Sequence, residues 1–199
     1  MADWASALIS SGAGLVGAVL GVWGTWFREE RRRKLEVGER GAYLAIMVGN
    51  ALSDFGHECA RVAEDEGRVE PSNGIDYRYS RVNAPKFDAA TYNVDWQAIP
   101  AELADRILRL PSLIQAVRDR LEGSYPDTDP EDAFFYFEDR QYMYAELGMH
   151  AFDAAAALRA HAGLPGRATL VAMLEVRRTE IEAVRRKRME EFHAPISLI

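Results

Sequence analysis

The pattern of apolar and charged residues changes sharply at position 28. No residue from Trp4 to Phe27 is charged, and a helix over this run would span about 36 Å, more than the roughly 30 Å hydrocarbon core of a bilayer. Tryptophans stand near both ends of the run, as is typical of rings at membrane–water interfaces. The pattern predicts a transmembrane helix within residues 1–27, and a long buried core helix is the alternative.

Basic residues follow the uncharged run at once. The window 28–34 holds five basic and two acidic residues, whereas Asp3 is the one charged side chain ahead of the run. A cleaved signal peptide has the opposite order, with its basic stretch first. Because basic flanks tend to remain cytoplasmic, we expect the N-terminus outside and the rest of the chain inside the cell. Contacts with anionic lipid are expected from Arg28, Arg31, Arg32, Arg33 and Lys34.

Small residues recur every four positions within the uncharged run, at Ala13, Gly17, Gly21 and Thr25. The spacing Gly17-x-x-x-Gly21 is a close-packing motif of transmembrane helix pairs, because two faces with few side-chain atoms can approach closely. This face predicts self-association of the span.

Beyond the run, apolar residues recur at intervals of three and four, which is typical of helices that bury one face. Gly38 and Gly41 offer a break in the first helix, and Pro111 predicts a kink or two short helices in the second. The predicted helices and their apolar stripes are 28–66 (Leu44, Val48, Ala51, Phe55, Cys59, Val62), 100–121 (Leu103, Ile107, Leu110, Ile114, Val117, Leu121), 130–162 (Phe137, Tyr144, Leu147, Ala151, Ala154, Leu158) and 169–192 (Leu170, Leu174, Ile181, Val184, Met189).

Residues 67–98 show no sustained period. A connection this long is uncommon without a role of its own, and its aromatic residues argue against disorder. We expect an irregular cover packed on the bundle, with Trp96 largely buried beside Tyr92, and with Tyr77 and Tyr79 more exposed. A lid over a ligand is the alternative.

The predicted fold is all-α, with an N-terminal transmembrane helix, a cytoplasmic bundle of about four long helices and one long aromatic-rich loop. No segment alternates strictly between apolar and polar residues, so no strand is expected. The predicted units are a transmembrane anchor over 1–27, a basic juxtamembrane segment over 28–43, a helical bundle over 44–192 that includes the cover at 67–98, and a tail over 193–199.

Composition excludes several classes of protein. The 199 residues carry a formal charge of −7 and a single cysteine, Cys59, which excludes a generally basic nucleic-acid binder, a disulfide scaffold and a multi-cysteine zinc module. The window 177–188 is basic, with six basic and two acidic residues, and is interpreted as a second membrane contact or a solvated helix face. Lysine occurs three times among 24 basic residues, a bias typical of a GC-rich bacterium, so the expected membrane is a bacterial inner membrane.

Polar residues at helical spacing raise the question of a metal site. Two-metal carboxylate bundles use two Glu-x-x-His motifs and further glutamates. This chain has Asp54-x-x-His57 and the differently spaced Glu146-x-x-x-His150, so the second motif is missing and neither a metal nor another cofactor is expected. The sequence has no phosphate loop, nucleophile elbow or His-Glu-x-x-His. Cys59 is interpreted as a small core residue.

Short motifs follow one another along the chain: Ala51-Leu52-x-x-Phe55, Val94-Asp95-Trp96, Arg109-Leu110-Pro111, Arg140-Gln141-Tyr142 and Gly163-Leu164-Pro165. With the anchor and its basic junction, this order resembles a family of bacterial proteins that have one N-terminal membrane anchor, an all-helical body and no established activity. The resemblance implies the layout and no catalytic residue.

These patterns together favour a non-enzymatic, membrane-tethered scaffold whose cytoplasmic bundle binds a protein partner or further copies of itself. One alternative is a membrane-perturbing effector of phage or defence origin, acting through the glycine-containing span. Another is a helical-bundle enzyme whose site the sequence does not reveal. The expected partners are the lipid bilayer and protein, and nucleic acid is not expected.

Overall fold

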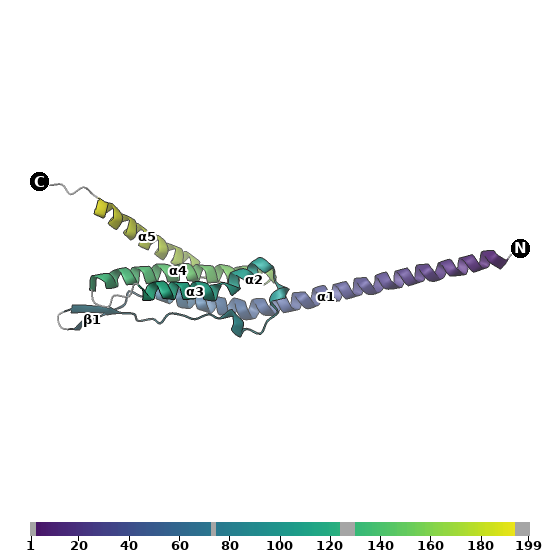
Figure 1. Cartoon of the computed structure of the whole chain (residues 1–199), viewed down its shortest axis with the longest axis horizontal. Helices are drawn as coiled ribbons and strands as arrows, with labels where there is room; N and C mark the ends of the chain where they lie inside the picture. The colour runs from purple at the N-terminus through teal and green to yellow at the C-terminus, as the bar shows by residue number, and fades with distance from the viewer. Residues whose placement is uncertain (1–2, 73–74, 124–129, 194–199) are drawn as a thin grey trace.

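The chain is mainly helical over the residues that the structure describes, which agrees with the predicted helical bundle (Figure 1). The computed structural model describes residues 3–72, 75–123 and 130–193, and it describes side chains for most residues from Trp26 onward. Its elements are α1 (Asp3–Ala63), β1 (Arg68–Ser72), β2 (Ile75–Tyr79), the short 3₁₀ turns η1 (Ala89–Thr91) and η2 (Trp96–Ala98), α2 (Ala101–Leu108), α3 (Leu110–Glu122), α4 (Pro130–His161) and α5 (Val171–His193).

The first helix, α1, runs for 61 residues without a break, and its N-terminal half projects from the bundle as a rod (Figure 1). The helix is not interrupted at Gly38 or Gly41, where the sequence allowed a break. A β-carbon at Gly41 would lie 3.0 Å from the Ala98 carbonyl oxygen, so this glycine lets η2 approach the helix. Within the described residues, no helix has a stretch long and apolar enough to cross a membrane. The side chains of residues 1–25 lie outside that description.

The core forms where the C-terminal half of α1 packs along α4, and α2, α3 and α5 also pack against α4. Two glycines allow α1 and α4 to approach closely. A β-carbon at Gly56 would lie 2.9 Å from the Phe152 ring, and one at Gly148 would lie 3.1 Å from the Cys59 β-carbon. Cys59 is buried in the core, as predicted. Burial is also confirmed for the predicted core residues Leu110, Ile114, Leu147, Leu158 and Leu174.

The stretch 100–121 forms two helices rather than one kinked helix. The helices α2 and α3 meet at Arg109, and Pro111 lies in the first turn of α3. A proline is tolerated there because its missing N–H group would have no partner within the helix. The proline therefore separates two helices whose apolar stripes face the same core.

The prediction that residues 67–98 contain no strand is wrong. The strands β1 and β2 form an antiparallel hairpin in which Val69 lies opposite Arg78. Apolar residues do alternate with polar ones in β2, at Ile75, Tyr77 and Tyr79, but each strand has only five residues and β1 contains a proline, so the pattern is too short to identify the hairpin by itself. Because β2 packs against α4, tertiary contact supports a hairpin that would be marginal alone.

The segment after the hairpin covers the bundle, as expected. Tyr92 and Trp96 pack against the core, but each is only partly buried. The prediction that Trp96 is largely buried is therefore too strong, because Trp96 begins η2 and the buried position of that turn belongs to Ala98. Tyr77 and Tyr79 are exposed, as predicted.

The last helix, α5, diverges from α4 toward its C-terminal end (Figure 1). Leu174 and Ile181 are buried as predicted, whereas Leu170, Val184 and Met189 are exposed. The prediction of a fully inward stripe is wrong for these three residues. Val184 and Met189 belong to the C-terminal part of α5, which diverges from α4, and Leu170 precedes the helix, so helical period alone does not bury these residues.

Candidate functional site

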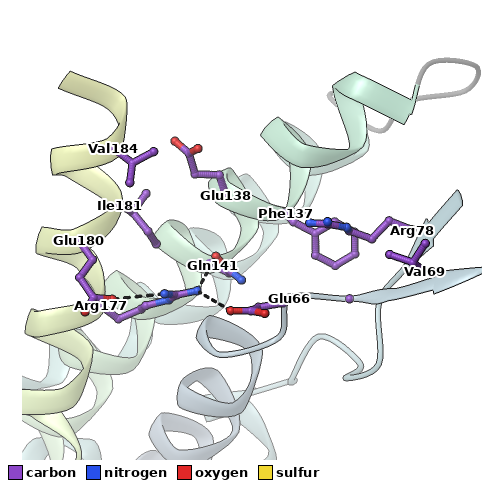
Figure 2. Close-up of a pocket in the computed structure, with 11 residues that line it drawn as sticks. Glu66, Val69, Arg78, Phe137, Glu138, Gln141, Arg177, Glu180, Ile181 and Val184 are labelled. Atoms are coloured by element: carbon purple, nitrogen blue, oxygen red, sulfur yellow. Dashed lines mark hydrogen bonds and ion pairs between the residues drawn. The ribbon is translucent and has the colours of Figure 1, made fainter. Parts of the chain in front are cut away.

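A groove opens where α5 diverges from α4, next to the end of α1 and the hairpin (Figure 2). We call it the α4–α5 groove, and its volume is about 470 Å³. Both apolar side chains and charged or amide side chains line it. The apolar ones are Val69, Phe137, Ile181 and Val184, and the polar ones are Glu66, Arg78, Glu138, Gln141, Arg177 and Glu180.

A buried carboxylate organises the chain where α1 gives way to the hairpin. Asp65 accepts hydrogen bonds from the backbone N–H groups of Gly67 at 2.9 Å and of Arg81 and Val82 at 3.0 Å. The guanidinium of Arg140, on α4, completes the set with an ion pair of 3.0 Å. Burial alone raises the pKa of Asp65, but the hydrogen bonds from Val82, Gly67, Arg140 and Arg81 outweigh burial and lower the pKa. Asp65 therefore stays ionised and ties both ends of the hairpin segment to α4.

A glycine lets the hairpin lie close to α4. Gly67 has a φ of +79°, a conformation that glycine adopts without steric cost. A β-carbon there would come within 2.7 Å of the Phe137 ring and of the Arg78 side chain. The Arg78 guanidinium carbon stands 5.8 Å from the centroid of that ring, which is a cation–π distance. Gly67 thus places Val69 and Arg78 at one wall of the groove.

Arg177 and Gln141 form the floor between α1, α4 and α5 (Figure 2). Gln141 donates to the backbone oxygen of Asp65 at 2.9 Å, and its own side-chain oxygen accepts from Arg177 at 3.2 Å. Arg177 also donates to the Ala63 carbonyl at 3.3 Å, one of the last carbonyls of α1, which lack partners within the helix. A cation at this helix end is also favoured by the helix dipole. Arg177 therefore connects α5 to the end of α1.

Ion pairs hold the charged side chains of the groove. Arg177 pairs with Glu180 at 3.3 Å and lies 3.9 Å from Glu66. Arg185 pairs with Glu138 at 2.8 Å, also pairs with Asp139, and stands over the Tyr142 ring at 4.7 Å from its centroid. Two arginines of the basic window 177–188 thus contact side chains of α4.

The polar side chains that line the groove are arginines, carboxylates and one amide. No serine, cysteine or histidine is among its described lining residues, and its three carboxylates all lie near arginines. The free thiol of the described chain, Cys59, is in the core, where burial and then the charge of Glu58 raise its pKa. A raised pKa disfavours the reactive thiolate.

The polar residues that raised the question of a metal lie apart from the groove. Asp54 and His57 are exposed on α1, and the His57 ring packs edge-on against Phe152 at 5.1 Å. Glu146 and His150 line a separate hollow of about 310 Å³ between α3, α4 and α5. Across the described part of the chain, no three His, Cys, Asp or Glu side chains come together as metal ligands.

The residues expected to act at a membrane are only partly described. Side chains of Ala13, Gly17, Gly21 and Thr25 lie outside the described residues. The five basic residues expected to contact lipid are exposed on α1, and three of them pair with glutamates one turn away. These pairs are Arg32–Glu36 at 2.8 Å, Arg33–Glu29 at 3.7 Å and Lys34–Glu30 at 3.3 Å.

The sequence contains a signal for the buried ion pair of Asp65 and Arg140, in the spacing of each residue from its neighbouring apolar stripe. Arg140 lies three residues after Phe137 and four before Tyr144, so it is in phase with the apolar stripe of α4. Asp65 follows Val62 by three residues and continues the stripe of α1. Charged residues in phase with a buried stripe need a partner, and here each is the partner of the other.

Fold and groove together define a mainly helical bundle with a small hairpin and an open groove at one end. No protein-family model, curated protein or solved structure matches the chain. The resemblance to a family of membrane-anchored helical proteins therefore stays a prediction.

Proposed function

We propose that this chain is a membrane-tethered, non-enzymatic binding module, in which α1 holds a cytoplasmic helical bundle at a bacterial inner membrane. One observation carries the proposal: α1 continues without a break from the uncharged run into the bundle core. A continuous helix would fix the bundle relative to the anchored run, whereas a flexible linker would not. The basic flank supports an N-terminus outside the cell and a bundle inside it.

The exposed basic residues after the run support this tether. Their ion pairs along α1 are solvent-exposed, and exposed pairs of this kind contribute only about 0–1 kcal/mol. Anionic lipid attracts each nearby Lys or Arg by about 1 kcal/mol. Lipid headgroups are therefore able to compete with the glutamates for these side chains.

The α4–α5 groove supports a role in binding protein. Four apolar side chains lie beside arginine–carboxylate pairs, and such a mixture of an apolar centre and charged surroundings is common at protein interfaces. The proposed occupant is an amphipathic segment, either of another protein or of a second copy of this chain. Self-association through the face of Gly17 and Gly21 would bring such copies together.

Reporter fusions to the complete chain test the tether and its direction. A reporter active only in the cytoplasm, fused after Ile199, is expected to be active, and the chain is expected to sediment with membranes and to resist extraction by carbonate. Recovery in the soluble fraction would refute the anchor. Activity of a periplasm-specific reporter at the same position would instead show that the C-terminus lies in the periplasm, which is opposite to the proposed orientation.

Site-specific photo-crosslinking tests the groove. A crosslinking amino acid at Val184, which lines the groove and is 47% exposed, is expected to give an adduct. The same group at Val176, which is 58% exposed and is not among the groove residues, is the matched control. An adduct of twice the chain mass indicates a second copy, and another mass indicates a different protein. Equal adducts at both positions, or none at Val184, would contradict the proposed groove.

A further inference from the structure

A second hollow lies between α3 and α4, on a face of α4 that is separate from the groove. Its volume is about 430 Å³, within the range of small-molecule sites. Three residues from α4, three from α3 and one from the segment after the hairpin line it. They are Tyr136, Arg140 and Tyr144, then Arg118, Leu121 and Glu122, and Ala84.

An unpartnered hydroxyl belongs to this hollow. Tyr144 is 1% exposed, and its hydroxyl has no hydrogen-bond partner among the described residues. Burial raises the pKa of Tyr144, and the nearby Arg118 guanidinium lowers it as a donor and as a positive charge. Arg118 has no acceptor atom, so the hydroxyl proton of Tyr144 is left without a partner. Buried polar groups in folded proteins nearly always have a partner. The hydroxyl therefore points to a missing acceptor near Arg118.

The charges around the hollow favour a single negative charge in the ligand. Arg140 is already paired with Asp65 at 3.0 Å. Arg118 donates to the Pro85 carbonyl at 2.8 Å, and no carboxylate among the described residues forms an ion pair with it. Glu122 is exposed and also lines the hollow, so a doubly charged phosphate would be poorly compensated. A carboxylate has one charge and two oxygens, which match Arg118 and Tyr144.

We propose that this hollow binds a small organic carboxylate with an aromatic or aliphatic body. The carboxylate accepts hydrogen bonds from Arg118 and Tyr144, and the body packs on Leu121 and Tyr136. The Tyr144 hydroxyl is shielded from solvent in the ligand-free chain, so a shift of the flexible Arg118 side chain accompanies binding. This site is independent of the α4–α5 groove and of the membrane tether.

Calorimetric titration of the full chain with benzoate and hexanoate tests the site, and neutral benzamide is the ligand control. Saturable binding of a carboxylate is expected, with benzamide at least about tenfold weaker. Arg118→Gln is expected to lower the affinity about tenfold or more and Tyr144→Phe about fivefold. Arg109→Gln, which changes an exposed arginine outside the hollow, should leave the affinity unchanged.

Thermal unfolding of the same variants separates binding from folding. Without ligand, Tyr144→Phe is expected to unfold at the same temperature as the parent chain or a higher one, because it removes a buried hydroxyl that has no partner. Weaker binding together with unimpaired stability would support the site. The proposal is overturned if neither carboxylate binds, if benzamide binds equally well, or if both variants bind the carboxylates as the parent does.

Discussion

Asp65 and Arg140 form an ion pair of 3.0 Å, with side chains that are only 1% and 4% exposed. They lie 75 positions apart in the sequence, one just after α1 and the other within α4. Removing two charges from water is costly, and the cost is offset only when every remaining donor and acceptor is satisfied. Asp65 meets this condition with three backbone N–H groups besides Arg140.

Removal of one partner of this pair is expected to destabilise the bundle strongly. Asp65→Ala should lower the free energy of unfolding by about 3–5 kcal/mol, because it leaves Arg140 charged and buried. Urea unfolding followed by circular dichroism measures the change. Glu36→Ala removes an exposed pair of similar length, 2.8 Å to Arg32, and should cost no more than about 1 kcal/mol. Similar losses in the two variants would mean that the Asp65 pair is not desolvated in solution.

The same carboxylate predicts a pH dependence of stability. The pKa of Asp65 is lowered in the folded chain from an ordinary value of 3.8, so the folded state binds its proton less readily than the unfolded state. Its stabilisation is therefore complete above the unfolded pKa and is lost as the pH falls through the folded pKa. The stability difference between the parent and Asp65→Asn should shrink as the pH falls from 7 to below 3.8.

Urea unfolding at several pH values measures that difference. The exposed Asp105→Asn variant controls for the general effect of removing a carboxylate, and its difference from the parent should vary little. If the difference in unfolding free energy between the parent and Asp65→Asn stayed constant over this pH range, Asp65 would have an ordinary pKa.

Two helical glycines are expected to respond oppositely to alanine. A β-carbon at Gly148 would lie 2.8 Å from the Leu174 side chain and 3.1 Å from the Cys59 β-carbon, whereas one at Gly38 meets nothing within 4 Å. Overpacking predicts that Gly148→Ala lowers the free energy of unfolding by about 1–3 kcal/mol. Gly38→Ala should raise helix stability by about 0.5–1 kcal/mol. Thermal unfolding measures whether each variant is more or less stable than the parent. Stabilisation by Gly148→Ala would contradict the close contact of α1 with α4.

Truncation of a core residue tests the packing of α4. Leu147 is 4% exposed, and Leu147→Ala should cost about 2–5 kcal/mol from lost burial and the cavity left behind. Leu113→Ala is the matched control, because Leu113 is 42% exposed on α3. A loss below about 0.5 kcal/mol for Leu147→Ala would mean that this stripe faces solvent or a partner.

The periodicity of the sequence determined where the helices lie and which of their faces are buried. Spacings of three and four repeat locally, so Leu110, Ile114 and Leu158 could be assigned to the core without knowledge of their neighbours. Local chemistry at Pro111 also predicted an interruption, either a kink or two short helices, and the structure has two helices. These features depend on residues close together in the chain.

Tertiary structure alone decided the hairpin, the course of α5 and the groove. The short strands need α4 beside them, and Val184 and Met189 are exposed because α5 diverges from α4. The partner of Asp65 is likewise set by how α1 and α4 pack, since a charge in phase with an apolar stripe shows only that some partner is needed. Local pattern specifies which face of an element is apolar, whereas the element that covers it and the spaces left between elements depend on the packing of the whole chain.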